Sequence, residues 1–261
     1  FAEPTNREEL VGIVVRCKEK NIPIRLIGSG SNLLVSDKGV QGVAVHLGAA
    51  EFGTIEVTET GLVAGGGARL SQFVSVAVRE GFAGPEQMVG LPGTIGGALH
   101  NNTGAHGVDI GMWVKSAEVL TRTGEVKKRT ADSMSFSYRQ SSLNELVILT
   151  AEFEFEKESP TDLTKAMQKL WIARRANQQG PEQRSAYMFQ DSGSETASEI
   201  ILSAGIKDTT VGGVSLVDGN PNFFVTEPGS TSGQVVELIE SVRTQVKEKL
   251  DVELQTAIQI W

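Results

Sequence analysis

Two glycine-rich segments contain the residues best suited to bind a phosphate-bearing ligand. The first, "GSGS", spans residues 28–31 after an apolar run, and the second, "GLPGTIGGALHNNTGAHG", spans residues 90–107 with six glycines. Glycine lets a ligand approach the backbone closely, and successive backbone N–H groups can converge on an anion. The Ser29 and Ser31 hydroxyls add further donors. Tight turns explain either segment equally well, but the presence of both favours a cradle for a pyrophosphate.

The first segment does not fit the two commonest phosphate-binding motifs. A Rossmann dinucleotide site needs its glycine turn to open directly into a helix. Residues 33–42, "LLVSDKGVQG", have no helical periodicity, which disfavours that site. A P-loop needs Gly-Lys followed by Ser or Thr, and no such triplet follows the glycines. We therefore expect a phosphate site of another architecture.

The chain has three histidines that could take part in acid–base chemistry. His46 lies within an apolar run and is expected to be structural. His100 and His106 lie in the second glycine-rich segment, and for each a hydrogen-bonded structural role and a catalytic role both stay open. No cluster of His, Cys and carboxylate residues has the spacing of a metal site, so we expect no metal cofactor.

The N-terminal residues predict a helix that would precede the first glycine segment. A capping box from Thr5 to Glu8 starts it, and Leu10, Val14 and Cys17 share one face. Cys17, the single cysteine of the chain, is therefore expected to be a buried apolar side chain. One cysteine also excludes an intramolecular disulfide.

The other elements alternate between strand and helix patterns. Strand runs at 22–28 and 43–47 predict a β-α-β-like opening. Farther on, the patterns predict hairpins over 55–67 and 115–130, helices over 68–81, 161–179, 194–205 and 231–250, and strands over 146–157, 222–228 and 252–261. Trp171, with its neighbours Leu170 and Ile172, is expected to belong to the core. The fold class is therefore α+β, in two or three subdomains.

The composition is that of a globular protein and limits its partners. The chain has 261 residues, 39% of them hydrophobic and 21% charged, with a formal net charge of −8. That charge disfavours a broad surface for nucleic acid or an anionic membrane. No apolar run reaches the roughly 18–20 residues of a membrane span. The chain starts at Phe1 rather than Met, so we expect a preceding segment, and we expect a cytoplasmic monomer.

The order of the motifs resembles that of one family of flavoenzymes. "GSGSNLLVSDKGVQG" (28–42), then residues 90–107, then "SYRQSS" (137–142) resemble UDP-N-acetylenolpyruvoylglucosamine reductase (MurB), an enzyme family of peptidoglycan precursor synthesis. The resemblance continues through "SAGIKDTTVGGVSLVDGNPNFFVTEPG" (203–229) and covers nearly the whole chain. It implies an FAD-binding fold of the vanillyl-alcohol oxidase / p-cresol methylhydroxylase type, followed by a MurB-like C-terminal substrate domain.

The same resemblance implies domains and a cofactor. Residues 1–48 would form FAD-binding subdomain 1, residues 49–181 with 252–261 FAD-binding subdomain 2, and residues 182–251 the substrate domain. Non-covalent FAD would be reduced by NADPH. The implied FAD contacts are Gly28, Ser29, Gly30, Ser31, Asn32 and Leu33 in the first segment, and Pro92, Gly93, Thr94, Gly96, Gly97, Asn102 and Gly104 in the second.

The family reaction needs a carboxylate-binding cation and a proton donor. The flavin passes hydride to the enolpyruvyl double bond of a UDP-sugar, and an acid protonates the adjacent carbon. Arg139 matches the family arginine beside the substrate carboxylate, where a fixed guanidinium stabilises developing negative charge. Tyr138 and Gln190 are implied as further substrate contacts.

The region of the proton donor departs from the family pattern. The family shows a segment like Ala-Gly-Ser/Cys-x-Phe-Lys-Asn-Pro, whereas this chain reads "RSAYMFQD" over residues 184–191. Alignment on Phe189 places Tyr187 at the donor position and Gln190 at the lysine, and Ser185 fits only with a shift of two positions. A phenol is a weaker acid than a thiol but a stronger one than an aliphatic hydroxyl, so Tyr187 can donate a proton.

Two further departures change the charge expected near the substrate. Asp191 stands where the family has asparagine, and Ala257, in "LQTA", stands where it has a catalytic glutamate. The FAD half thus resembles the family closely and the substrate half less so. Alternatives to a working reductase are a paralogue that binds FAD but has a changed substrate, and a catalytically silent flavin-binding protein. Arg139 favours an enzyme.

Overall fold

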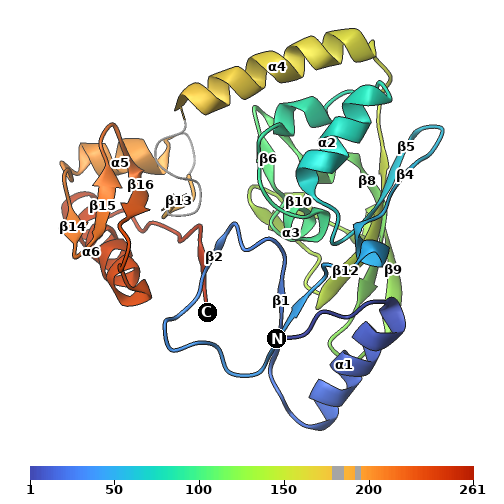
Figure 1. The fold of residues 1–261 in the computed structure, drawn as a ribbon. Coiled ribbons are helices and arrows are strands. Elements are labelled where there is room, and N and C mark those ends of the chain that lie inside the picture. Colours follow the sequence, from blue (N-terminus) through green and yellow to red (C-terminus); the bar gives the residue numbers. More distant parts are fainter. Residues whose placement is uncertain (178–184, 192–194) are drawn as a thin grey trace. The chain divides into compact units, whose positions relative to one another are not determined.

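The computed structural model describes residues 1–177, 185–191 and 195–261 (Figure 1). By their internal contacts, these residues form two compact units. Unit 1 contains residues 1–31 and 41–177, and unit 2 contains residues 32–40 and 178–261. The mixture of helices with mostly antiparallel strands confirms the predicted α+β class.

Unit 1 begins with helix α1 (Arg7–Glu19), which starts one residue later than the predicted capping box requires. Asn6 is the N-cap, and its side-chain oxygen accepts a hydrogen bond from the Glu9 N–H at 2.9 Å. Thr5 instead donates from both its N–H and its hydroxyl to the Glu9 carboxylate. Because Asn and Thr are both good N-caps, the sequence alone does not separate the two positions. Cys17 is buried as predicted.

The parallel pair of strands β1 (Ile24–Ile27) and β3 (Val43–His46) follows α1, with Ile24 opposite Val43. The predicted β-α-β-like order is wrong, because the helix precedes both strands and none lies between them. Parallel strands need a long connection, and here it is the first glycine segment with β2 (Leu33–Leu34).

A five-stranded antiparallel sheet forms the centre of unit 1, with the strand order β4-β5-β12-β8-β9. Both predicted hairpins, β4–β5 and β8–β9, are confirmed, as is the long predicted strand β12. Along β12, Ala151 and Phe153 are buried and alternate with more exposed residues. The strands are β4 (Ile55–Val57), β5 (Gly61–Gly65), β8 (Val114–Leu120), β9 (Val126–Thr130) and β12 (Val147–Glu154).

Two helices contribute apolar side chains to the same core as the sheet. Helix α2 (Leu70–Arg79) provides Phe73, whose ring centroid lies 4.7 Å from that of Phe153. Helix α3 (Ile95–His100) provides Ile95 and Leu99, which are fully buried. Shorter elements complete unit 1: η1 (Ala50–Gly53), η2 (Pro85–Met88), η3 (Ile110–Trp113), η4 (Ala131–Ser133), β6 (Gly104–Ala105), β7 (Val108–Asp109), β10 (Phe136–Ser137) and β11 (Gln140–Ser141).

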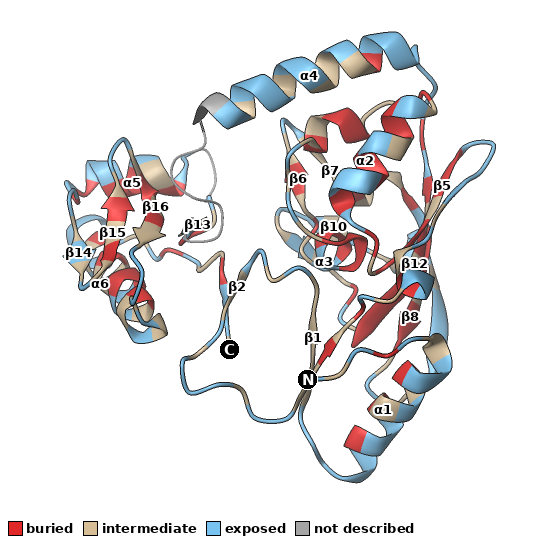
Figure 2. Cartoon of the chain, viewed as in Figure 1, coloured by how far each residue is buried: buried red, intermediate tan, exposed pale blue. Residues whose placement is uncertain are grey.

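The prediction that Trp171 and its neighbours belong to the core is wrong for helix α4 (Pro160–Asn177). Trp171 and Ile172 are 46% and 63% exposed, so they are not core residues, and Leu170 is half-buried. Figure 2 shows how little of this helix is buried. The two exposed side chains border an apolar groove whose other lining residues are Val89, Met167 and Gln168.

Unit 2 contains an antiparallel sheet in the order β13-β16-β15-β14, with two helices that share its core. Phe224 and Leu216 contribute to that core from the strands, and Leu238 and Val242 from helix α6. The elements are β13 (Ser185–Tyr187), α5 (Ala197–Ser203), β14 (Thr210–Val211), β15 (Val214–Val217), β16 (Asn220–Thr226) and α6 (Ser232–Leu250).

The C-terminal strand is shorter than predicted and pairs within unit 2. Strand β17 (Gln259–Ile260) runs parallel to β2, with Gln259 opposite Leu33. By their contacts, residues 252–261 therefore belong to unit 2. The division into FAD-binding subdomains and a substrate domain stays a prediction.

Asp37 ties the segment 32–40 to the start of α6 and should make the stability of unit 2 depend on pH. Its carboxylate accepts hydrogen bonds from the hydroxyl and the N–H of Ser232, at 2.7 and 2.8 Å, and these bonds lower the pKa of Asp37. A carboxyl whose pKa is lower in the folded state stabilises the fold above its unfolded pKa of about 3.9, and the effect is lost as the pH falls through the folded value.

We therefore expect Asp37→Asn to be less stable than the wild type at neutral pH, with a difference that shrinks as the pH falls below about 5 and through the lowered pKa of Asp37. Urea unfolding at several pH values measures this difference. A difference that does not vary with pH would contradict the assignment.

No helix in the described part of the chain has both the length and the apolarity to cross a membrane. Across residues 1–177, 185–191 and 195–261, no group of three or more His, Cys, Asp or Glu side chains is placed to hold a metal ion.

Candidate functional site

The structure brings the two glycine-rich segments together within unit 1. A Cβ atom added to Gly28 would lie 2.9 Å from the hydroxyl oxygen of Thr94, and one added to Gly93 would lie 3.7 Å from that of Ser31. Gly30 has φ +71°, a conformation that glycine adopts readily. The loop 28–31 therefore lies against the residues that lead into α3.

Thr94 is the N-cap of α3, and its hydroxyl accepts a hydrogen bond from the Gly97 N–H at 3.3 Å. This short helix was not predicted, because three glycines at positions 93, 96 and 97 obscure its pattern. The N–H groups at the start of a helix and in a glycine loop carry partial positive charge, which suits an anionic diphosphate.

Most glycines of the second segment are explained by the protein itself. Gly93 has φ +129°, and Gly90 has φ +75° and lies against the Arg174 side chain. A Cβ on Gly96 would lie 3.0 Å from the Gly66 carbonyl oxygen. One on Gly104 would lie 2.2 Å from a carbonyl oxygen of β7. A positive φ or a neighbouring group of the chain itself therefore accounts for glycine at these positions.

Gly97 is different. It is exposed, its φ is not positive, and a Cβ there would meet only the Thr94 hydroxyl, at an ordinary 3.5 Å. Glycine in a helix is less favourable than alanine by about 1 kcal/mol. Nothing in the described structure therefore requires glycine here. An open backbone surface beside helix-start N–H groups fits a bound FAD, which presents a diphosphate and a flat ring.

We expect Gly97→Ala to weaken FAD binding by about 10-fold or more without lowering stability, because the added methyl would fill space needed by the ligand. Gly12→Ala is the matched control, since Gly12 is an exposed helical glycine with open space around it. Titration of the apoprotein with FAD measures the affinity, and thermal unfolding without FAD measures stability. Equal FAD affinity in both variants would show that Gly97 faces no cofactor.

Arg139 occupies the turn of the β10–β11 hairpin, with its backbone in the left-handed region at φ +56°. Its guanidinium donates from Nη1 to the Gly104 carbonyl oxygen at 3.0 Å and lies 5.2 Å from the Tyr138 ring centroid. The structure thus brings the predicted substrate arginine to a predicted cofactor-lining residue. Tyr138 is 54% exposed beside it.

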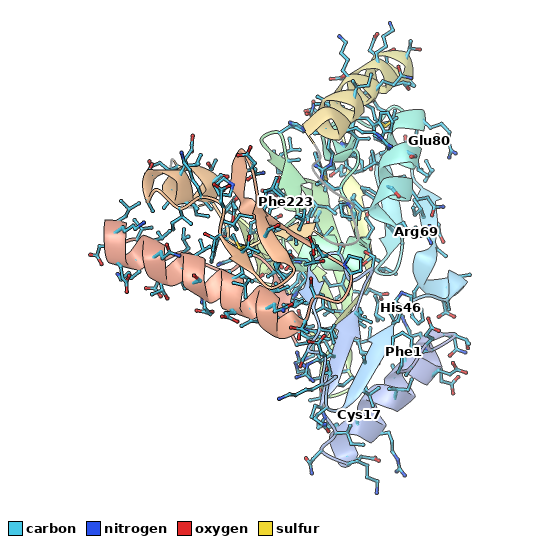
Figure 3. All side chains as sticks on the ribbon, turned by 60° about the vertical axis from the view of Figure 1, so that its left-hand side comes forward. Phe1, Cys17, His46, Arg69, Glu80 and Phe223 are labelled. Carbon is cyan, nitrogen blue, oxygen red and sulfur yellow. The ribbon has the colours of Figure 1, made fainter. Side chains whose placement is uncertain are left out.

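Two of the three histidines have identifiable structural partners, and the third lies in a turn. His100 donates from Nδ1 to the Leu143 carbonyl oxygen at 3.1 Å. His106 has φ +54° and Gly107 φ +86° in the turn that joins β6 and β7. His46 lies 2.8 Å from the Glu3 carboxylate and stacks on Phe1 (Figure 3).

The four altered family positions, Tyr187, Gln190, Asp191 and Ala257, lie on two adjoining stretches of unit 2. The Ala257 N–H donates to the Met188 carbonyl oxygen at 2.8 Å, and the Gln190 N–H donates to that of Gln255 at 2.9 Å. The side-chain amide of Gln190 makes a long contact of 3.4 Å with the Thr256 carbonyl oxygen. The sequence departures therefore belong to one local region.

Within this region, the side chain of the predicted donor Tyr187 is accessible to solvent. It is 55% exposed, and its ring contacts that of Phe223 edge-on at 4.8 Å. Ser185 begins β13, but its side chain lies outside the described residues. Asp191 accepts a hydrogen bond from the Ala197 N–H at the start of α5, where a helix stabilises negative charge.

Asn32 and Leu33, predicted as FAD contacts, belong to unit 2. The Asn32 side chain donates to the Ala257 carbonyl oxygen at 2.9 Å, and its own carbonyl accepts from the Gln259 N–H at 3.0 Å. Leu33 is half-buried in β2. Within unit 2, these contacts hold Asn32 against the stretch that carries Ala257.

Sequence reasoning missed one organising residue of unit 2. The buried Asn222 side chain accepts from the Phe189 N–H and donates to the Phe189 carbonyl oxygen, both at 2.9 Å. It thereby fixes the backbone between Tyr187 and Gln190. No local pattern marks it, because its partner is 33 residues away in the sequence.

Known protein families match both ends of the chain. The sequence model of the family described as FAD binding domain matches residues 1–129. The model described as UDP-N-acetylenolpyruvoylglucosamine reductase, C-terminal domain, matches residues 178–261.

Proteins named UDP-N-acetylenolpyruvoylglucosamine reductase are similar along the full chain. The one from Rhodopirellula baltica is 38% identical over 261 residues, which cover 100% of this chain and 86% of the relative. The one from Heliobacterium modesticaldum is 34% identical over 264 residues, which cover 100% of this chain and 83% of the relative.

Solved structures of similar fold support the same family relationship. The reductase (MurB) from Thermus caldophilus is 27% identical, with a TM-score of 0.80 over 98% of this chain and 90% of that one. 6-Hydroxy-D-nicotine oxidase from Arthrobacter nicotinovorans shares the fold at 11% identity, with a TM-score of 0.61 over 98% and 82%. These similarities confirm the predicted FAD-binding fold and C-terminal domain. The chain is an FAD-dependent oxidoreductase and belongs to the UDP-N-acetylenolpyruvoylglucosamine reductase family.

Proposed function

We propose that this protein reduces the enolpyruvyl double bond of UDP-N-acetylglucosamine enolpyruvate, with NADPH as the hydride source. The name shared by its full-length relatives supports this substrate. The single structural observation that carries the proposal is the open backbone surface at Gly97, because no neighbouring atom of the described chain explains a glycine there.

The chain's own residues would bind the cofactor without a covalent bond. Backbone N–H groups of the loop 28–31 and of the start of α3 would bind the diphosphate, with the exposed Ser29 and Ser31 hydroxyls as further donors. The surface at Gly97 would admit the ligand close to the backbone. Bound FAD supplies hydride transfer from NADPH to the alkene.

Two side chains would complete the reduction. The Arg139 guanidinium would bind the substrate carboxylate and stabilise the negative charge that develops as the alkene accepts hydride. The Tyr187 phenol would then give its proton to the neighbouring carbon. Tyr187 is favoured over Ser185 because it matches the donor position without a shift. Tyr138 and Gln190 would contact the substrate as well.

Stopped-flow absorbance of the FAD-loaded protein tests this function. The protein is mixed with NADPH and then with UDP-N-acetylglucosamine enolpyruvate. Loss of the visible flavin band on the first mixing, followed by its fast return on the second, is the expected result. A band that NADPH does not bleach would contradict the hydride source.

A second candidate is a flavoenzyme of the same family with a changed substrate, or one without activity. It is favoured by the absence of side-chain charge at both Gln190 and Ala257, which adjoin the same stretch of unit 2. Bleaching by NADPH without return of the band on adding the UDP-sugar would select this candidate. Other alkenes that carry a carboxylate would then be screened in the same way.

We propose that the protein acts as a monomer in the cytoplasm, without nucleic-acid or membrane partners. The formal net charge of −8 supports the absence of a surface for polyanions. Light scattering of the FAD-loaded protein tests the oligomeric state, and a dimer mass would overturn it.

A further inference from the structure

The turn that carries Arg139 is too small to hold its own shape. Strands β10 and β11 form two residue pairs, Phe136 with Ser141 and Ser137 with Gln140. A two-stranded hairpin is marginal by itself even when it is longer. The φ of +56° at Arg139 adds strain, because a side chain disfavours the left-handed region. Contacts from outside the hairpin must therefore fix it.

Asn102 provides such a contact at the strand that leads to the turn. Its side chain is buried, with the residue 1% exposed. The amide nitrogen donates to the Ser137 carbonyl oxygen at 2.8 Å, and the amide oxygen accepts from the Gly111 N–H at 3.1 Å. Because Ser137 lies two residues before Arg139, this amide connects the turn after α3 directly to the arginine's hairpin.

Neighbouring residues attach the rest of the hairpin to the same stretch. The Arg139 guanidinium donates to the Gly104 carbonyl oxygen at 3.0 Å. On the second strand, the Ser141 hydroxyl donates to the His100 carbonyl oxygen at 3.0 Å. The hairpin is thus held at its first strand, its tip and its second strand by residues 100–104, and Asn102 contributes the one buried side chain among these contacts.

We propose that Asn102 is a positioning residue that sets the place of the Arg139 guanidinium, and that its side chain is not a flavin contact. The proposal rests on the proposed function for the role of Arg139. The nitrogen and the oxygen of the Asn102 amide each make a hydrogen bond within unit 1, so the side chain has little remaining capacity to bond a ligand. Its surroundings also explain the choice of asparagine.

Position 102 requires both a particular backbone conformation and a side chain with a donor and an acceptor. Its backbone has φ +44°, which asparagine tolerates better than most residues. Its side chain must donate at one end and accept at the other. Glycine meets the first requirement and removes the side chain. Aspartate keeps the shape but places a carboxylate oxygen against the Ser137 carbonyl oxygen.

The test compares Asn102→Asp and Asn102→Gly with Asn144→Asp, a control that adds the same charge in an exposed loop. In the FAD-loaded enzyme we expect substrate-driven reoxidation to slow by about 10- to 100-fold in both Asn102 variants, because small displacements of a catalytic group have effects of that size. Reduction by NADPH and FAD affinity should be unchanged. Hydrogen exchange of the amides in residues 135–142 should speed up, and the control should match the wild type in every measurement.

A double-mutant cycle separates positioning from general structure. In an Arg139→Ala background, Asn102→Gly should slow reoxidation no further. Weaker FAD binding, or slowing that persists without Arg139, would overturn the proposal, as would unchanged hydrogen exchange. If the wild type itself is not reoxidised by the UDP-sugar, the proposed function has failed, and the exchange measurement alone decides whether Asn102 holds the hairpin.

Discussion

Tyr187→Phe is expected to slow substrate-driven reoxidation of the reduced flavin by about 100-fold or more, while reduction by NADPH stays at the wild-type rate. The substitution removes the phenol hydroxyl, which is the proposed proton donor, and keeps the ring. The edge contact with Phe223 at 4.8 Å is therefore retained, so the fold of β13 should not change. Stopped-flow absorbance measures the two half-reactions separately.

Phe223→Leu is the matched control for Tyr187→Phe, because it removes the contacting ring and leaves the phenol. It should change the reoxidation rate far less than Tyr187→Phe does. A Tyr187→Phe enzyme with the wild-type rate would exclude this donor, and Ser185→Ala would then be the next variant to measure.

Replacement of Arg139 by alanine or by glycine is expected to slow reoxidation by about 100- to 1,000-fold, the range found when a group that stabilises developing negative charge is removed. The two variants should differ in stability. Glycine suits the φ of +56°, whereas alanine keeps the strain of the left-handed region, so Arg139→Gly should be more stable by about 1 kcal/mol.

Urea unfolding of the apoproteins measures that difference, and stopped-flow measures the rates. Arg139→Lys keeps a positive charge but loses the fork of donors, and it should recover only part of the rate. Full recovery by lysine would mean that charge alone is needed at this position.

The sequence predicted elements well where one face of a regular pattern is buried. The alternation over residues 146–157 predicted β12, and the helical pattern over 231–250 predicted α6 nearly to its ends. It failed at Trp171, because a periodic pattern shows which residues share a helix face but not whether another element covers that face. The C-terminal strand was predicted too long because its partner, β2, offers two residues.

Motifs in the sequence predicted the candidate site, and the structure distinguishes which of its glycines the chain itself accounts for. The glycines of residues 90–107 are indistinguishable in the sequence, yet the backbone or a turn explains Gly93, Gly96 and Gly104, and leaves Gly97 unexplained. The motif also predicts Asn102 as a cofactor contact, whereas one of the two residues that its side chain bonds in the structure, Ser137, is 35 residues away in the sequence. Long-range hydrogen bonds of this kind have no local signal, so they could not be predicted.

The pairing of β2 with β17 has a consequence for how the chain can be divided. Unit 2 draws residues 32–40 from the middle of the N-terminal region, so the polypeptide passes from one unit to the other three times. A fragment cut at residue 178 would lack β2 and would leave β17 without its partner and α6 without Asp37. Residues 178–261 alone therefore lack part of unit 2, and we expect the isolated unit to gain stability when residues 32–40 are added as a peptide or joined to its end.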